Sequence, residues 1–132
     1  MNKLVKSVDK ADLYKEFLKS LNGVLQLTDR ELELMVTLVE LDVAYVKLPG
    51  CSKNVINSEN RKYIRQKLGI TPDNLSRYIG RFKEKGLLVQ GKVEDEVTVN
   101  KAIIPELIGD RVQITVILKI KNDEKNNKAA ND

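Results

Sequence analysis

The sequence predicts an α+β domain in which four helices precede a β-hairpin and one further strand. Two observations support this fold class. Apolar residues recur every three or four positions through much of residues 10–85, which is the period of an amphipathic helix, whereas short apolar runs and strict alternation follow Gly86. A length of 132 residues fits one domain with a modest core. We therefore assign residues 1–121 to a single domain and the polar residues 122–132 to a flexible tail.

The first helix is predicted at residues 10–22, where Leu13, Phe17 and Leu21 form an apolar stripe. Asp9 is placed to cap its start and Gly23 to end it. Two uses of the stripe stay open, because it can cover the core of the domain or pack against a second subunit.

The second helix is predicted at residues 28–42, where Thr28 and Glu31 have the spacing of a capping box. Its apolar residues cover most of the circumference and leave only Glu33, Thr37 and Glu40 as a polar strip. A helix this apolar is buried on several sides. It is either the central helix of the domain or half of a homodimer interface to which helix 10–22 contributes.

Residues 58–86 have the boundary signals of a helix–turn–helix. Asn57 or Ser58 caps a helix at 59–68, and Gly69 has the position of a left-handed C-terminal cap. Thr71-Pro72 then supplies an N-cap followed by a proline at the first helical position, which begins a helix at 72–85. The turn has the length expected between such helices, and Ile70 within it is predicted to enter the core.

A β-hairpin is predicted at residues 87–104, with strands at 87–89 and 97–99 and a tip at 90–96. Val55-Ile56 has the composition of a short additional strand. Residues 111–121 alternate apolar and mostly polar side chains, so we expect a half-buried strand that joins the same sheet.

Positive charge is concentrated on the helix–turn–helix. Residues 59–92 contain nine Lys or Arg and three acids, a net charge of +6, whereas the other 98 residues have a net charge of −2. Such a distribution favours a polyanionic partner, and the alternative is a solvated basic face without a partner.

Helix 72–85 separates a core face from an arginine face. Leu75, Ile79 and Phe82 cluster on one side of a helical wheel, and Arg77 and Arg81 lie on the other, one turn apart. Arginine and asparagine can bind guanine and adenine edges in the major groove. Ion pairs from Asp73 to Arg77 and from Arg81 to Glu84 would instead make this an ordinary charged face. The DNA-binding residues that we predict are Arg61, Arg65, Thr71, Asn74, Ser76, Arg77, Arg81 and Lys83.

Other functions find little support in the composition. There is no histidine and one cysteine, so the commonest metal ligand and general base are missing, and we expect no metal or cofactor. No nucleophile–base set, paired carboxylates or phosphate-binding glycine loop is present, which favours a non-enzymatic protein. With no membrane-length apolar run and no export signal, we expect a cytoplasmic location without membrane contact.

The block from Leu27 to Val99 resembles the winged helix–turn–helix superfamily. The residues that carry the resemblance are LTDRELELM, ENRKYIRQKLGITPDNLSRYIGRFKEKGLLV and the return strand VTVN. The phrase LSRYIGRFKEKGLL is similar to the recognition helix and first wing strand of MarR-like regulators and of plasmid or phage replication initiators. The segment VNKAIIPEL is similar to the return strand of such initiators, with its proline displaced to position 105. The small size and the Lys/Asn-rich composition resemble phage-encoded proteins.

The resemblance implies a winged helix–turn–helix with an added N-terminal helix and an extra C-terminal β-strand. It also implies DNA contacts by Asn74, Ser76, Arg77 and Arg81. The acidic tip Glu94-Asp95-Glu96 departs from the pattern, because a wing of this charge would be repelled by DNA.

Two functions follow as hypotheses. The first is a DNA-binding regulator of transcription or replication that places helix 72–85 in the major groove of double-stranded DNA. The second is a winged-helix protein–protein interaction module that acts as a phage virion, assembly or packaging component. The acidic tip and the alternating strand at 111–121, which could augment the sheet of a partner, motivate the second hypothesis.

Overall fold

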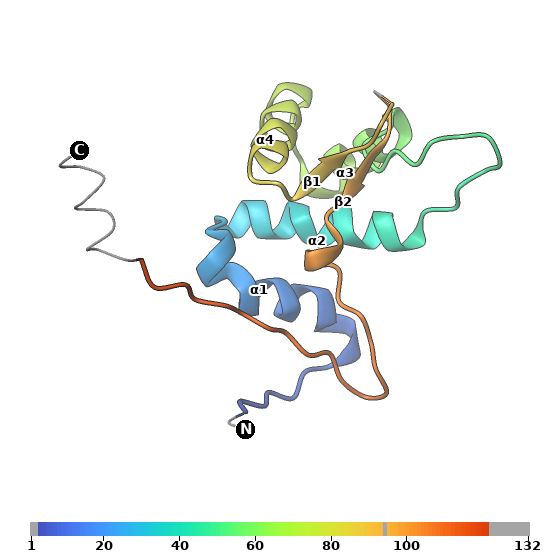
Figure 1. Ribbon diagram of the computed structural model, residues 1–132. Helices are drawn as coiled ribbons and strands as arrows, with labels where there is room; N and C mark the ends of the chain where they lie inside the picture. The colour runs from blue at the N-terminus through green and yellow to red at the C-terminus, as the bar shows by residue number, and fades with distance from the viewer. Residues whose placement is uncertain (1–2, 94, 122–132) are drawn as a thin grey trace, which may run out of the picture.

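A computed structural model describes residues 3–93 and 95–121 and has an α+β architecture (Figure 1). The helices are α1 (Leu13–Leu25), α2 (Asp29–Ala44), α3 (Ser58–Leu68) and α4 (Pro72–Glu84). The strands are β1 (Leu88–Gln90) and β2 (Val97–Val99), and short 3-10 turns lie at η1 (Lys10–Asp12) and η2 (Lys101–Ile103). The order of helices followed by a hairpin confirms the predicted α+β class. The predicted tail at 122–132 lies outside the described residues, as does Glu94 of the hairpin tip.

Helix α2 lies at the centre of the fold. Figure 1 shows α1 on one side of α2, and α3, α4 and the β-hairpin on the other side. Leu34, Met35, Leu38 and Val39 of α2 are fully buried, which confirms that this helix is covered on several sides. Because elements of the same chain provide that cover, the apolar circumference of α2 is accounted for within the monomer.

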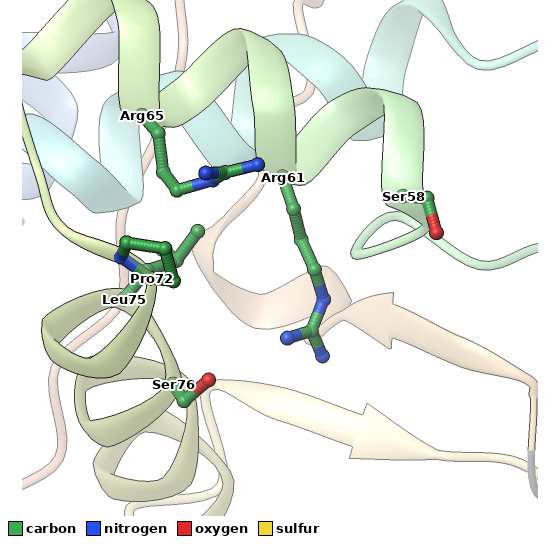
Figure 2. Close-up of a pocket in the computed structure, with 6 residues that line it drawn as sticks. All are labelled: Ser58, Arg61, Arg65, Pro72, Leu75 and Ser76. Atoms are coloured by element: carbon green, nitrogen blue, oxygen red, sulfur yellow. The ribbon is translucent and has the colours of Figure 1, made fainter.

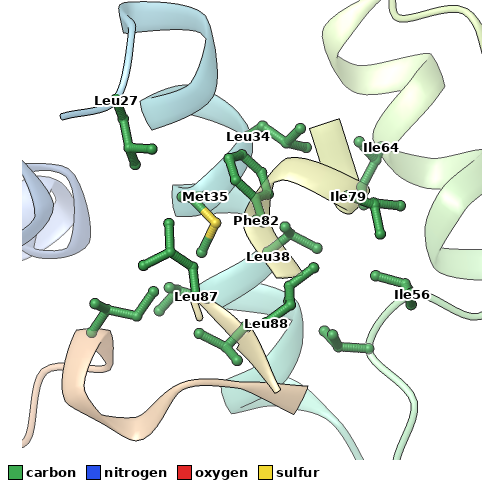
Figure 3. Close-up of a cluster of buried hydrophobic side chains, with 14 of the residues drawn as sticks. Leu27, Leu34, Met35, Leu38, Ile56, Ile64, Ile79, Phe82, Leu87 and Leu88 are labelled. Carbon is green, nitrogen blue, oxygen red and sulfur yellow. The ribbon is translucent and has the colours of Figure 1, made fainter. Parts of the chain in front are cut away.

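The hydrophobic core joins both sides of α2 (Figure 3). Phe82 of α4 packs among leucines of α2 and of β1, and Ile64 of α3 and Ile79 of α4 close the cluster. Ile70, in the turn between α3 and α4, is also buried, as its position in the sequence predicts. This packing fixes the orientation of α3 and α4 relative to the rest of the domain.

Local capping signals determine where these helices begin. Thr28 forms the complete capping box with Glu31 at the start of α2. Asn57, rather than Ser58, caps α3 by accepting a hydrogen bond from the N–H of Asn60.

Helix α1 differs from its prediction at both ends. It continues through Gly23 to Leu25, and Gln26 takes the left-handed C-cap conformation with φ 55°. The half-buried Leu25 packs against the core, which explains why the last turn persists despite the low helix propensity of glycine. At the other end Asp9 makes no side-chain cap, and α1 begins at Leu13 after a 3-10 turn.

The sheet is a hairpin in which Leu88 pairs with Val99, and Gln90 pairs with Val97. The other edge of β2 pairs with residues 53–55, since the N–H of Val55 donates to the carbonyl of Val97 at 2.9 Å and the N–H of Val97 donates to the carbonyl of Lys53 at 3.1 Å. The strand predicted at Val55-Ile56 is thus a single parallel bridge centred one residue earlier, at Asn54.

A buried carboxylate fastens the hairpin to α2. Asp42 is 5% exposed, and its Oδ2 accepts a hydrogen bond from the N–H of Val99 at 2.8 Å. Its Oδ1 accepts one from Nζ of Lys53 at 2.7 Å. One side chain of α2 therefore holds β2 and the neighbouring chain segment in place.

The prediction of a strand at residues 111–121 is wrong. Arg111 forms an isolated bridge with Ile108 across a tight turn, and the residues after it are extended coil without a sheet partner (Figure 1). Val112 packs against the core at partial burial, and the side chains of residues 113–121 are exposed. Alternation alone does not form a strand, because a strand needs an edge to pair with. Here β1 and residues 53–55 occupy both edges of β2, and the segment after Arg111 runs on the α1 side of α2, away from the remaining edge at β1 (Figure 1).

Candidate nucleic-acid interface

The α3–α4 pair is held at a fixed angle by its turn and by α2. Gly69 closes α3 in the left-handed conformation at φ 65°, and Thr71 caps α4 by accepting a hydrogen bond from the N–H of Asn74. A guanidinium nitrogen of Arg30 on α2 donates to the carbonyl of Leu68 at the end of α3. Leu75, Ile79 and Phe82 of α4 are buried as predicted, so the opposite face of this helix is turned to solvent.

Arg77 lies on the outward face of α4, where its guanidinium donates to the side-chain oxygen of Asn74. Asn74 is a neutral partner, and among the described residues Arg77 makes no ion pair with Asp73. The positive charge of Arg77 is therefore uncompensated by a direct contact. Asn74 and Arg77 share a small surface hollow of about 180 Å³ with Tyr78 and Arg81.

Arg81 makes a tertiary ion pair that was not predicted from the sequence. Its Nη2 lies 3.4 Å from Oε2 of Glu31, a carboxylate that is 1% exposed, whereas the alternative pair with Glu84 is absent from the described contacts. The Arg81 side chain is still 55% exposed, so one side of its guanidinium faces solvent. Arg81 thus anchors α4 to the start of α2 and contributes to the outward face as well.

The capping box keeps Glu31 ionised despite its burial. Burial on its own would raise the pKa of Glu31, but the backbone and side-chain hydrogen bonds with Thr28 and the charges of Arg81 and Lys85 outweigh it, so the pKa lies below its usual value. Glu31 was recognised in the sequence as a capping residue, and its contact with α4 gave no sequence signal.

A second hollow of about 210 Å³ lies between α3 and α4, shown in Figure 2. Arg61 and Arg65 reach into it from α3, and Ser76 faces it from α4. Nε of Arg61 donates to the carbonyl of Ile56 at 2.7 Å, which fixes the side chain while its terminal nitrogens point toward the α4 side. The residues that line the hollow include no acid: they are Ser58, Arg61, Arg65, Pro72, Leu75 and Ser76.

This hollow suits a small anionic group at the protein surface. Two guanidinium groups without a lining carboxylate attract an anion, and the serine hydroxyls can donate to it. Its volume is below the roughly 300–1,000 Å³ of a pocket for a drug-sized ligand. A phosphate group of a larger molecule fits both the charge and the size.

The other predicted contacts separate into two groups. Lys83 is exposed, forms no ion pair among the described residues, and lies two turns after Ser76 on the same side of α4. Thr71 has its hydroxyl occupied by the cap. The structure therefore gathers Arg61, Arg65 and Ser76 in one hollow and Asn74, Arg77 and Arg81 in the other, with Thr71 at the start of α4 and Lys83 near its end.

The hairpin tip is acidic where it is described. Asp95 is exposed, Glu96 is half-buried, and Lys92 is exposed nearby. The side chain of Gln90 donates to the carbonyls of Val93 and Glu96, which closes the tip. The tip therefore adds negative charge at the end of the hairpin.

Two further observations concern membrane-spanning helices and metal-binding clusters. No described helix has the length and apolar character that crossing a membrane requires. The described residues also contain no cluster of three or more His, Cys, Asp or Glu with the geometry to hold a metal ion.

Comparison of the chain with protein-family models, with curated proteins and with solved structures found no match. The case for a function therefore rests on the geometry and charge of α3 and α4.

Proposed function

We propose that this chain is a non-enzymatic winged-helix DNA-binding protein that regulates transcription or replication and places α4 in the major groove. The observation that carries the proposal is the pair of arginines Arg65 and Arg77. Both face the solvent side of the α3–α4 pair, and neither has an acidic partner among the described residues. Unpaired guanidinium groups on the exposed face of such a pair favour nucleic acid as the partner.

The order of the elements supports the winged-helix assignment. A central helix, two helices joined by a three-residue turn, and a β-hairpin follow one another as α2, α3, α4 and β1–β2. Residues 53–55 pair with the free edge of β2 and so extend the hairpin by one short segment. In this assignment α1 is the added N-terminal helix, and the extra C-terminal strand is not part of the sheet.

The residues of the two hollows bind different parts of the DNA. Arg77 and Asn74 project from the outward face of α4 and read base edges, with arginine directed to guanine and asparagine to adenine. Arg61, Arg65 and Ser76 bind the phosphate backbone beside the groove. Lys83 adds a phosphate contact farther along α4, and the acidic tip of the hairpin points away from the DNA.

A binding assay with matched variants tests the proposal. The double variant Arg65→Ala, Arg77→Ala removes one predicted phosphate contact and one predicted base contact. The control Lys15→Ala, Lys19→Ala removes the same charge from the exposed surface of α1, on the other side of α2. Arg81 is left intact, because its loss would leave the buried Glu31 without its cation.

Fluorescence anisotropy with a labelled duplex at low salt measures both affinities. The arginine variant is expected to bind about 30-fold or more weakly than the wild type, since a bidentate base contact is worth about 1–3 kcal/mol and a phosphate contact adds to it. The lysine variant is expected to stay within about threefold of the wild type, an effect of net charge alone. Equal losses in the two variants, or no binding of any duplex by the wild type, would reject the proposal.

A protein–protein interaction module is the second candidate, and the loop between α2 and α3 favours it. This loop exposes Val46 at 80% and Leu48 at 63%, which is more apolar surface than a solvent loop requires. Asp95 at the hairpin tip would suit a basic partner surface. In this reading the chain serves as a phage virion, assembly or packaging component. Co-purification with a stoichiometric protein partner, together with no shift of any DNA, would favour it over DNA binding.

A further inference from the structure

Residues 112–120 form an extended segment that is rich in apolar residues although most of its side chains are exposed to solvent. Ile117 is 76% exposed, Leu118 84% and Ile120 97%. Within the described part of the chain, the backbone N–H and C=O groups of residues 112–121 make no hydrogen bond to protein. A solvated connection would be polar, whereas this segment has the composition and alternation of a strand that is covered on one face.

The alternation is also symmetric about Val116. Counting outward from Val116 in the two directions gives Thr115 and Ile117, then Ile114 and Leu118, then Gln113 and Lys119, and then Val112 and Ile120. An antiparallel pair of two identical strands centred on Val116 therefore places apolar residues opposite apolar residues along one whole face. Antiparallel self-pairing is the arrangement that a two-fold axis generates.

We propose that residues 112–120 pair with the same segment of a second copy of this chain, as an antiparallel β-ribbon with Val116 opposite Val116. The pairing satisfies the backbone groups that face the partner strand, and it brings Ile114, Val116, Leu118 and Ile120 of each copy into contact with apolar side chains of the other copy on the same face. It differs from a dimer through α1 and α2, because α2 is already enclosed within its own chain.

The area available fits a dimer that also uses the N-terminal arm. The four exposed apolar residues on the Val116 face, Ile114, Val116, Leu118 and Ile120, at their exposures and at roughly 100 Å² of burial for a fully exposed side chain, supply about 270 Å² per copy. A stable interface needs about 800 Å² per partner. Leu4 and Val5 are 103% and 89% exposed, and Leu107 and Ile108 are more than half exposed, so burying these four as well raises the apolar contribution to about 580 Å² per copy, and the backbone and polar atoms of the paired strands supply the remainder.

The ribbon would leave the α3–α4 face open. Figure 1 shows the segment on the α1 side of α2, opposite α4. The ribbon does not depend on DNA binding, and its failure would leave the proposed function intact.

Charge gives the dimer a distinctive salt response. In this register Arg111 of one copy lies opposite Lys121 of the other, and of these two only Arg111 has a partner of opposite charge among the described residues, Asp110 at 3.2 Å. Like charges placed opposite each other repel, and salt screens them. Dimerisation is therefore expected to strengthen as salt rises, whereas DNA binding weakens.

Cysteine cross-linking in the full-length chain tests the register. In a Cys51→Ser background, which removes the exposed native thiol, Val116→Cys is expected to form a disulfide dimer under mild oxidation. The two residues lie directly opposite each other, within the Cα separation that a disulfide allows. Ile120→Cys is the matched control, because its two copies lie eight strand positions apart, about 26 Å. The combination Val112→Cys, Ile120→Cys restores an opposed pair and should cross-link.

The control is stringent, because Ile120 is twice as exposed as Val116 in the monomer, and random collision would favour it. Cross-linking of Ile120→Cys at a rate equal to that of Val116→Cys would overturn the proposed register.

Light scattering on the untagged wild type between micromolar and hundreds of micromolar concentrations should show a mass that rises from 15.0 kDa toward twice that value. Ile114→Lys, Leu118→Lys changes exposed side chains, so the monomer should keep its fold, checked by circular dichroism, and lose the dimer. A wild type that stays monomeric over this range, or a dimer that survives the double lysine variant, would overturn the proposal.

Discussion

Asp42 should be the most sensitive charged residue for the stability of this domain. Asp42→Ala removes the acceptor of the Val99 N–H and the partner of the Lys53 ammonium in one step. Leaving a buried N–H without an acceptor costs about 1–3 kcal/mol. Lys53 is 29% exposed and can regain water, so the loss of its partner costs less than the about 3–5 kcal/mol of a fully buried pair.

Together these effects predict a loss of about 3 kcal/mol in the free energy of unfolding, or roughly 10 °C in Tm for a domain of this size. The measurement is urea denaturation followed by circular dichroism, with the slope of the transition compared between variants. Glu40→Ala is the matched control on the same helix. Its ion pair with Lys67 spans 3.7 Å with both side chains well exposed, so its loss should cost about 0.5 kcal/mol or less.

A double-mutant cycle of Asp42→Ala with Lys53→Ala separates the two contacts. A coupling energy of about 1 kcal/mol or more would assign part of the loss to the ion pair, and the remainder to the Val99 hydrogen bond. If Asp42→Ala falls within about 0.5 kcal/mol of Glu40→Ala, the reasoning from buried hydrogen bonds is refuted.

Three further predictions concern Glu31 and the glycines. Because the pKa of Glu31 is lowered in the folded state, its ionisation stabilises the fold above its ordinary pKa near 4.5, and that contribution disappears as the pH falls through the lower folded value. Chemical denaturation at a series of pH values should therefore show a steeper loss of stability below pH 4.5 in the wild type than in Glu31→Gln, and parallel curves would count against this. Gly69→Ala should lower the free energy of unfolding by about 1–2 kcal/mol, because φ is 65° at this position. No atom lies within 4 Å of the added methyl group, so the loss comes from the backbone conformation alone, and an unchanged Tm would contradict the left-handed cap. Gly80→Ala and Gly23→Ala both add a methyl group at an open position inside a helix, and each should raise the free energy of unfolding by about 0.5–1 kcal/mol. Only Gly80→Ala, on the outward face of α4, should weaken DNA binding. Equal DNA affinities of the two variants would exclude a close approach of DNA at Gly80.

Local signals in the sequence were sufficient for the centre of the fold. Thr28, Gly69 and Thr71-Pro72 act within one helical turn, so their side chains determine the ends of α2, α3 and α4 without help from distant residues. The apolar stripe of α4 was equally reliable, because Leu75, Ile79 and Phe82 have one face of the helix to themselves. The fold class follows from these elements.

Features that depend on a contact with a distant part of the chain could not be predicted from local sequence patterns. Gly23 lies in a helix that Leu25 prolongs by packing on the core, and the alternation at 111–121 has no free edge of β2 to join. The burial of Asp42 was not predicted from the sequence either. Its partners Lys53 and Val99 are set by the tertiary fold.

Helical spacing predicted where the side chains of the candidate site lie, but not their contacts with other elements. Arg61, Arg65 and Arg77 lie where helical spacing places them, on the exposed side of the α3–α4 pair. Spacing along one helix also allowed ion pairs of Arg77 with Asp73 and of Arg81 with Glu84. Neither pair is among the described contacts, because the fold brings Glu31 to Arg81, and Asn74 accepts from Arg77. Pairs at i,i+4 are worth only about 0.2–0.5 kcal/mol, so tertiary contacts readily replace them.

The salt dependence of duplex binding tests the central claim most directly. The slope of log K against log salt concentration reports the number of phosphate contacts, at about 0.9 for each contact on B-form DNA. For the wild type, contacts from Arg61, Arg65 and Lys83 predict a slope of about −3. Arg65→Ala should lower its magnitude by about 0.9, and Lys15→Ala on α1 should leave it unchanged. A wild-type slope near zero, or an unchanged slope in Arg65→Ala, would contradict DNA binding by this face.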